Sequence, residues 1–216
     1  MKASADQIRQ RFDGAVEYLS DPERGQTAIP DAALALDLVA EAAAVATPHA
    51  RHVLDVGCGA GNYTLRLLRR LPGLDATLLD LSDALLERAA ERVGAATPGG
   101  VATLRGDVRE VELGEERFDV VVAGAVLHHL RAEEEWRAVF AKLYAALRPG
   151  GSLWVSDLVD HAAPEIRAAM AGRYAAYLVR LGGEELRAVG FAGVEVLHKT
   201  SCFATFGALK PPAPPG

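Results

Sequence analysis

Cysteine is scarce in this chain. Only Cys58 and Cys202 occur in 216 residues, too few for a disulfide framework, and neither has a partner at metal-ligand spacing. The longest apolar run, from Val120 to Leu127, is far shorter than the roughly 20 residues that cross a bilayer. The first fourteen residues mix acidic and basic side chains, so we expect no signal peptide there. The expectation is a cytoplasmic protein with no metal site and no membrane span.

A basic surplus is also absent. The sequence has 23 Lys and Arg against 29 Asp and Glu, a formal net charge of −6. Nucleic-acid-binding proteins need a clustered basic face, so this balance argues against a nucleic-acid partner. Hydrophobic residues make up 50% of the chain, which is enough for a globular core. A globular domain that acts on a small molecule is the expectation.

Short apolar runs alternate with amphipathic stretches from residue 51 onward. This pattern predicts strands at 51–56, 76–79, 101–104, 118–123, 152–156, 194–198 and 202–206, and helices at 62–70, 83–93, 133–147, 163–181 and 184–189. Ser82 is a predicted N-cap, and Arg148-Pro149-Gly150-Gly151 should separate a helix from the next strand. Such alternation predicts an α/β fold, with a parallel sheet covered by helices on both faces.

Two attachments flank the expected core domain of residues 47–210. Residues 1–46 carry two helical segments, 8–19 and 32–46, while the proline-rich residues 211–216 are expected to be a disordered tail. The N-terminal segment is expected to fold over the ligand site as a lid. A homodimer contact or a simple flank of the sheet are the alternatives.

The sharpest signal is a glycine-rich bend between a strand and a helix, Leu54-Asp55-Val56-Gly57-Cys58-Gly59-Ala60-Gly61-Asn62. Glycines let the backbone approach a ligand closely, and the start of the helix presents free N–H groups. A dinucleotide fingerprint would place its third glycine at position 62, where this chain has asparagine. The bend therefore indicates a ligand other than a dinucleotide.

Three acids follow or precede this bend at strand ends. Asp55 suits an α-ammonium group, Asp80 suits two ribose hydroxyls, and Asp107 suits the amino group of adenine. A solvated strand end is the alternative for Asp80 and for Asp107. Together the three carboxylates point to S-adenosyl-L-methionine.

Five stretches within residues 50–160 resemble the class I S-adenosylmethionine-dependent methyltransferase superfamily: LDVGCGAGNYT, LLDLS, GDV, FDVVVAGAVLHHL and LRPGGSLWVSDL. The resemblance implies a Rossmann-like, seven-stranded, mostly parallel sheet with an antiparallel last strand, and S-adenosyl-L-homocysteine as the product. It implies cofactor contacts at Asp55, Gly57, Asp80 and Asp107. The expected cofactor site is completed by Cys58, Gly59, Gly61, Asn62, Leu81, Gly106, Val108, Ala123 and Gly124, and by Gln26 and Thr27 on the cofactor carboxylate.

Methyl transfer needs alignment and a dry pocket, and it needs a base only where the nucleophile arrives protonated. Ala123-Gly124-Ala125 is expected to form a floor whose small side chains admit the substrate. The candidate catalytic residues at this end of the sheet are His128, His129 and Asp157. Packing and loop anchoring are the alternative for the histidines, and helix capping for Asp157.

Candidate substrate contacts lie outside these motifs. They are Tyr18, Arg173, Tyr174 and Tyr177, with core packing as the alternative for the tyrosines on the later helix. Glu133-Glu134-Glu135 is expected to be a solvated helix start.

Methyl transfer to a small-molecule acceptor is the leading function. One alternative is a carboxy-S-adenosylmethionine synthase-like enzyme, whose C-terminal strand ends in residues similar to Gly207-Ala208-Leu209-Lys210. That reaction would need a basic pocket for the donor carboxylate. The other alternative is a cofactor-binding protein without catalysis, whose acceptor side would be filled by the lid.

Overall fold

A seven-stranded sheet forms the centre of the computed structural model, which describes residues 4–21, 32–158, 187–200 and 203–213. The strands are β1 His52–Val56, β2 Asp75–Asp80, β3 Val101–Arg105, β4 Phe118–Gly124, β5 Leu147–Leu158, β6 Ala192–Thr200 and β7 Phe203–Leu209. Their order is β3-β2-β1-β4-β5-β7-β6. Pairs from β3 to β5 are parallel, and β7 is antiparallel to both of its neighbours. The predicted Rossmann-like sheet with an antiparallel last strand is confirmed.

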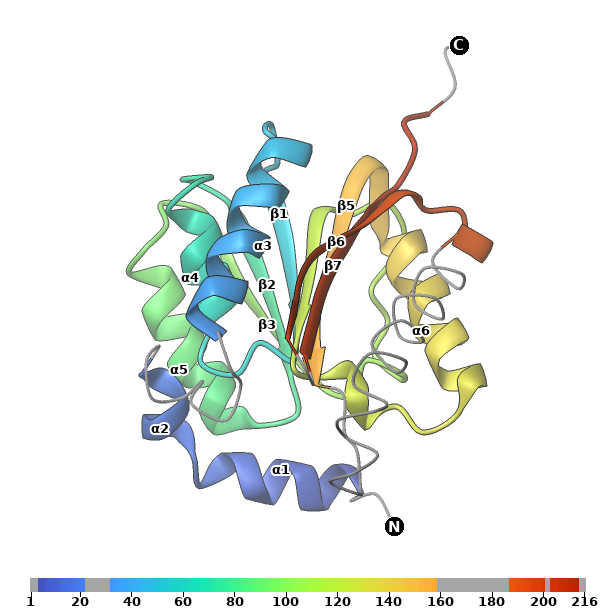
Figure 1. Ribbon diagram of the computed structural model, residues 1–216. Helices are drawn as coiled ribbons and strands as arrows, with labels where there is room; N and C mark the ends of the chain where they lie inside the picture. Colours follow the sequence, from blue (N-terminus) through green and yellow to red (C-terminus); the bar gives the residue numbers. More distant parts are fainter. Residues whose placement is uncertain (1–3, 22–31, 159–186, 201–202, 214–216) are drawn as a thin grey trace.

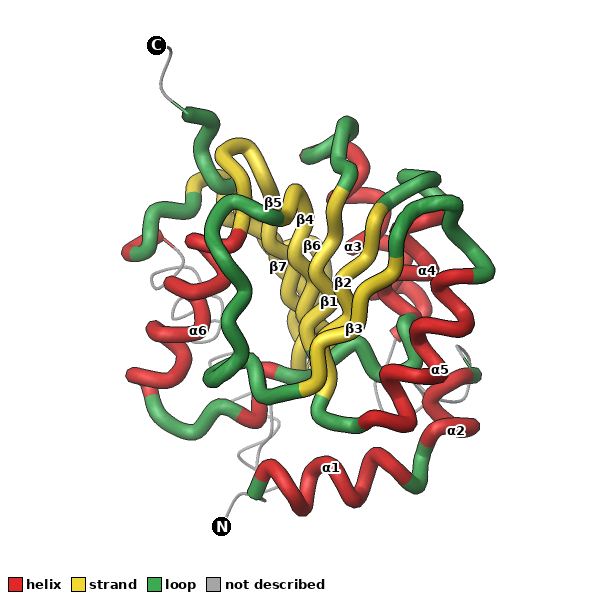
Figure 2. Tube along the Cα trace, turned by 180° about the vertical axis from the view of Figure 1, so that it is seen from behind, coloured by secondary structure: helices red, strands yellow, loops and turns green. Residues whose placement is uncertain are grey.

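Helices cover both faces of this sheet (Figures 1 and 2). On one face lie α3 Ala32–Ala46, α4 Asn62–Leu68 and α5 Asp83–Gly94, and on the other lies α6 Glu133–Ala146. Side chains of β4 alternate between the two cores: Val120 and Val122 pack with α3 and α4, while Val121 and Ala123 pack with α6. Burial on both faces explains why β4 reads as a nearly continuous apolar run.

The start of β5 differs from the prediction. The sequence Arg148-Pro149-Gly150-Gly151 was expected to be a loop, but β5 already begins at Leu147, directly after α6. The register against β4 shifts between Phe118 and Val120, so the strand bulges here. The N–H of Gly150 donates to the carbonyl of Lys210 at 3.0 Å, and the N–H of Lys210 donates to Gly151 at 2.7 Å. These bonds with the residue that follows β7 hold residues 148–151 in the sheet.

Two short helices, rather than the one predicted over 8–19, begin the chain. They are α1 Ala5–Asp13 and α2 Val16–Ser20, separated at Gly14. Ser4 caps α1 in a reciprocal pair of hydrogen bonds with Gln7. Both helices lie at the end of the sheet where the parallel strands finish (Figure 1). The predicted helix at 163–181 lies outside the described residues, as does the first part of the one at 184–189.

Candidate functional site

The glycine bend joins β1 to α4 with positive φ at three glycines. At Gly57, φ is 65°, and an added Cβ would lie 2.5 Å from Cγ2 of Val126. At Gly59, φ is 51°, and no described atom lies within 4 Å of an added Cβ. Glycine is therefore needed at 57 for packing and conformation, and at 59 it leaves bare backbone open to a ligand.

Asp80, at the end of β2, holds this bend in place. One of its oxygens accepts from the N–H of Gly59 at 2.9 Å, and the other accepts from the N–H of Ser82 at 3.0 Å. Burial raises the pKa of Asp80 above its ordinary value, against the effect of these bonds. Each oxygen keeps further lone-pair capacity, so the carboxylate fits a hydroxyl-bearing ribose as well as the bend. Ser82 caps α5 as predicted, since its Oγ accepts from the N–H of Leu85.

Asp55, at the end of β1, lies beneath the bend and is 1% exposed. Its Oδ2 accepts from both the hydroxyl and the N–H of Thr64 in the first turn of α4. Burial raises the pKa of Asp55 to about 7. The nearby carboxylate of Asp80 adds to this rise. No described Lys or Arg forms an ion pair with either acid in the structure, so this part of the site favours a cationic ligand.

Two further residues of the bend make internal contacts. The side-chain amide of Asn62 donates to the carbonyl of Leu19 at 3.0 Å and accepts from Arg92 at 2.9 Å. It thereby joins α2 and α5 to the bend. Cys58 is buried, and burial raises the pKa of its thiol, which is against a nucleophilic role.

A groove of about 390 Å³ lies between the ends of β2 and β3 and helix α1. Its volume falls in the range of about 300–1,000 Å³ usual for small-molecule sites. The lining residues are Asp6, Arg9, Leu81, Arg105, Gly106, Asp107, Arg109 and Glu110. Three of these, Leu81, Gly106 and Asp107, were predicted from the sequence, and Val108 is buried beside them. Asp107 is engaged by the guanidinium of Arg109.

An aromatic ring lies against the end of β4. An added Cβ at Gly124 would lie 2.0 Å from Cε2 of Tyr63, so the small residue accommodates this aromatic ring from α4. A hydrogen bond links Tyr63 to Ser156, and burial raises the pKa of the phenol well above its ordinary value. Sequence reasoning missed Tyr63, because only the fold brings it against Gly124. The ring occupies the space in the Cβ direction of Gly124, and the expectation that residues 123–125 form a floor admitting substrate stays a prediction.

Asp157 organises the segment after β4. Its Oδ2 accepts from three consecutive backbone N–H groups, those of Val126, Leu127 and His128, at 2.6–3.2 Å. Its Oδ1 lies 2.6 Å from Nδ1 of His128, and the Asp157 side chain is 7% exposed. The predicted candidates are therefore brought together: a buried carboxylate fixes both the loop and the orientation of the His128 ring.

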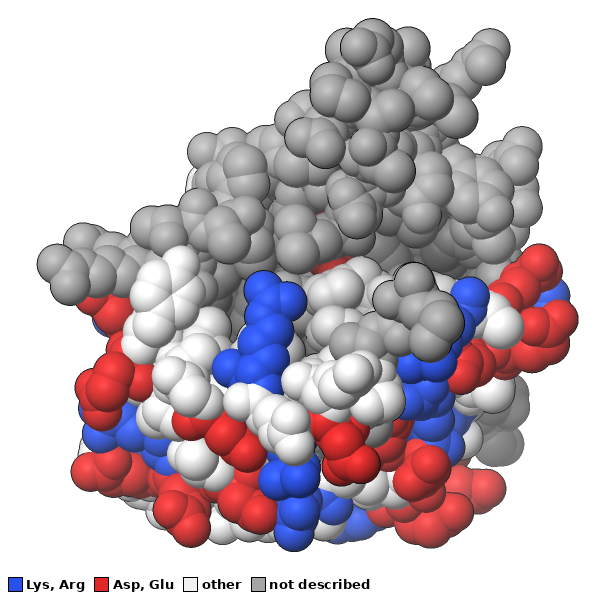
Figure 3. All heavy atoms as spheres, turned by 90° about the horizontal axis from the view of Figure 1, so that it is seen from below, with Lys and Arg blue, Asp and Glu red and all other residues white. Residues whose placement is uncertain are grey.

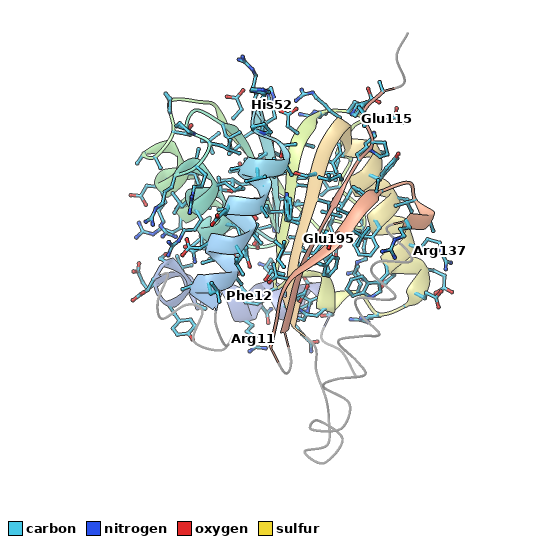
Figure 4. The ribbon with its side chains drawn as sticks, turned by 45° about the horizontal axis from the view of Figure 1, so that its top comes forward. Arg11, Phe12, His52, Glu115, Arg137 and Glu195 are labelled. Carbon is cyan, nitrogen blue, oxygen red and sulfur yellow. The ribbon has the colours of Figure 1, made fainter. Side chains whose placement is uncertain are left out.

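His129 faces the N-terminal helices. Its ring lies 4.1 Å from that of His128 and 6.4 Å from that of Phe12 on α1, measured between centroids. Figure 4 labels Phe12 at this end of the sheet and His52 at the opposite end. Further contacts of the N-terminal segment join Asp13 to Ser82 at 2.6 Å and Ser20 to Arg88 at 3.2 Å. These contacts hold α1 and α2 against α5, and a lid over the ligand site stays a prediction.

The remaining candidates are less well placed by the structure. Tyr18 on α2 is 44% exposed. Gln26, Thr27, Arg173, Tyr174 and Tyr177 lie outside the described residues. Seen from below, described Lys and Arg side chains are interspersed with Asp and Glu, so this part of the surface has no broad basic field (Figure 3). Within the described part of the chain, every helix is too short or too polar to span a bilayer.

Comparison with known protein families and sequences gives a consistent result. A family model described as a methyltransferase domain matches residues 53–151. An uncharacterized methyltransferase of Mycobacterium bovis is 38% identical over 107 residues, which are 50% of this chain and 50% of that protein. A carboxy-S-adenosyl-L-methionine synthase of Chromohalobacter salexigens is 34% identical over 151 residues, 68% of this chain and 52% of that protein. The chain thus spans about half the length of these relatives.

A solved structure shares the fold along nearly the whole chain. It is the N-methyltransferase NodS from Bradyrhizobium japonicum in complex with S-adenosyl-L-homocysteine, which superposes with a TM-score of 0.68 at 16% identity. The superposition covers 94% of this chain and 98% of that one. At this identity the likeness supports the fold rather than a particular substrate.

Proposed function

Because the chain belongs to the class I S-adenosylmethionine-dependent methyltransferase superfamily, we propose that it transfers a methyl group in line from S-adenosyl-L-methionine to a small-molecule acceptor. The proposal rests above all on the bend at Gly59, whose open backbone is tied directly to the carboxylate of Asp80. That arrangement places backbone without a side chain and a hydroxyl acceptor side by side.

Each acid at the strand ends has a part in binding. Asp80 accepts hydrogen bonds from the ribose hydroxyls, and Asp55 stabilises the α-ammonium group from beneath the bend. Asp107 and the groove beside Leu81 hold the adenine. The bound cofactor supplies a methyl group already activated by its sulfonium. The protein contributes alignment and exclusion of water, which account for roughly 7–11 kcal/mol in such reactions.

His128 is the base that we assign for a nucleophile that arrives protonated. The contact between its Nδ1 and Oδ1 of Asp157 orients the ring, and Nε2 is the nitrogen that we assign to take the proton. Asp157 acts through His128 by fixing its ring and its backbone. His129 makes a tilted contact with the ring of His128 and an edge contact with that of Phe12, so it is better suited to anchoring α1 than to catalysis.

Calorimetry with S-adenosyl-L-methionine and S-adenosyl-L-homocysteine tests the binding part of the proposal. We expect both to bind, and Asp80→Ala to weaken both by 10-fold or more, on the order of one lost charged hydrogen bond. Asp75→Ala is a matched control, because Asp75 begins the same strand at the opposite end. Failure of both compounds to bind the wild-type chain would falsify the proposal.

A base at His128 has its own test. A screen that follows release of S-adenosyl-L-homocysteine identifies an acceptor, and the pH–rate profile is then measured. His128→Ala should remove the acid limb of this profile, whereas His129→Ala should leave its shape unchanged. An unaltered profile in His128→Ala would assign His128 to loop anchoring alone.

Carboxylation of the cofactor is the second candidate, favoured by the match of 151 residues to a carboxy-S-adenosyl-L-methionine synthase. It requires a cationic group for the donor carboxylate near the end of β4. The arginines that line the described groove lie elsewhere: Arg105 and Arg109 are at and after the end of β3, and Arg9 is on α1. Intact mass of the ligand that copurifies with the protein separates the two reactions.

A further inference from the structure

A chain of three charged side chains connects α6 to the groove. Arg109 contacts Asp107 with its Nε on one carboxylate oxygen and its Nη2 on the other. The remaining nitrogen of the guanidinium, Nη1, donates to Glu135 at 2.9 Å. The side chains are 13% exposed at Asp107 and 29% exposed at Arg109 and Glu135, so these three residues are partly shielded from solvent.

Of the three residues predicted to form a solvated helix start, Glu133 and Glu134 are exposed as expected, whereas Glu135 is half-buried. It lies in the first turn of α6, where its other oxygen accepts from the N–H of Arg131. Hydrogen bonds from Arg131 and Arg109 lower the pKa of Glu135, so it stays ionised at neutral pH. The Glu135 carboxylate therefore holds the guanidinium of Arg109 in the plane in which two of its nitrogens contact the two oxygens of Asp107.

The hydrogen-bonding capacity of Asp107 is thereby nearly used up. A carboxylate has about four lone-pair sites. Oδ1 accepts from the N–H and from Nε of Arg109, each at 2.9 Å, and Oδ2 accepts from Nη2. One acceptor site is left, on Oδ2. Although burial opposes it, the bonds from Arg109 lower the pKa of Asp107, so this site remains an acceptor and not a donor.

We propose that Arg109, held by Glu135, is a positioning residue that leaves Asp107 one acceptor site facing the groove and so selects a 6-aminopurine nucleoside. The inference rests on the proposed function, which places the adenine in this groove. A 6-amino group donates to the remaining site on Oδ2. A purine without that group leaves the site unpaired, and a 6-oxo purine presents an oxygen to the carboxylate.

The test compares two ligands in each protein. One is S-adenosyl-L-homocysteine, and the other is the same compound with unsubstituted purine as its base. In the wild type we expect the adenosyl compound to bind about 10-fold more tightly or better, the factor for one hydrogen bond to a charged acceptor. In Arg109→Met and Glu135→Gln the ratio of the two affinities should approach one, because the carboxylate of Asp107 is no longer held in place.

Two further variants separate positioning from other effects. Arg109→Lys keeps the positive charge but cannot contact both oxygens of Asp107 through two nitrogens. The ratio of the two affinities should therefore also fall in this variant. Lys142→Met is the matched control: Lys142 on α6 donates to the carbonyls of Val108, Arg109 and Val111, so its loss loosens the same loop. It should weaken both ligands by the same factor and leave the ratio unchanged. Circular dichroism checks that each variant is folded.

The outcomes are distinct. If S-adenosyl-L-homocysteine does not bind the wild type, the proposed function itself fails. If it binds but Arg109→Met keeps or raises the ratio, Arg109 competes with the base instead of positioning its acceptor, and the inference is overturned. If Arg109→Lys kept the affinity ratio of the wild type, the inference would be overturned as well, since a positive charge alone would then be enough to orient Asp107.

Discussion

Thr64 donates two hydrogen bonds to the same oxygen of Asp55, one from its hydroxyl at 2.7 Å and one from its N–H at 3.3 Å. The pair ties the first turn of α4 to the end of β1. Even with these bonds, burial raises the pKa of Asp55 to about 7. The bend is therefore built over a carboxyl group that is close to half protonated at neutral pH, and this has consequences for stability and for binding.

Stability of the ligand-free protein is expected to fall as the pH rises toward neutral. The folded-state pKa of Asp55, about 7, exceeds its ordinary value of 3.8, so the folded chain holds the extra proton. This stabilisation is complete below the ordinary pKa and is lost as the pH rises through the folded one. At about 1.4 kcal/mol per pKa unit the loss is on the order of 4 kcal/mol.

Urea unfolding as a function of pH measures this loss. Asp55→Asn mimics the protonated acid, so it should remove most of the slope between about pH 4 and pH 7 and be more stable than the wild type at pH 8. A slope that persists in Asp55→Asn would assign the titration to another group.

Proton release should accompany cofactor binding. The α-ammonium group that we propose for this position favours ionised Asp55. Calorimetry of S-adenosyl-L-homocysteine in buffers of different ionisation enthalpy should give nearly one proton released at about pH 6 and almost none above about pH 8. Thr64→Val removes one stabilising bond, so its release should extend to higher pH. Release that does not vary with pH in either protein would argue against the ammonium contact.

Gly124→Ala is expected to be destabilising because of Tyr63. The new methyl group would meet the phenol ring, and overpacking of this kind costs about 1–3 kcal/mol. Tyr63→Leu in the same chain should recover most of the loss, which a double-mutant cycle by urea unfolding measures. Equal effects of Gly124→Ala in the presence and absence of Tyr63 would show that the ring is not the cause.

Asp157→Ala should cost much more stability than Asp157→Asn. The alanine leaves three converging N–H groups without their acceptor, a loss of at least about 3 kcal/mol, whereas asparagine keeps one oxygen. Thermal unfolding of both variants checks the order. Similar melting temperatures would mean that water replaces the carboxylate at this loop.

Features that depend on near neighbours in the chain could be predicted from the sequence. Helix α3 has the predicted bounds, 32–46, and Ser82 caps α5 through a bond that spans three residues. The glycine bend and the acids at the strand ends were found because strand, bend and helix follow one another directly. A local motif of this kind is enough to predict the arrangement of strand, bend and helix.

Contacts between distant residues could not be predicted in the same way. Arg109 and Glu135 are 26 residues apart, and nothing in the local pattern of either indicates the other. The Pro-Gly-Gly sequence before Ser152 signals a break, but pairing with Lys210 keeps it within the strand. In both cases tertiary hydrogen bonds outweigh local preference.

The position of β7 governs when the sheet can be finished. Synthesised after every other strand of the sheet, β7 nevertheless lies between β5 and β6 instead of at an edge. While it is still within the ribosome, β6 has no strand to join, and one border of β5 is exposed to other chains. Completion of the sheet therefore waits for β7, and synthesis interrupted shortly before Phe203 would yield an aggregation-prone product that lacks β7 and leaves β6 unpaired.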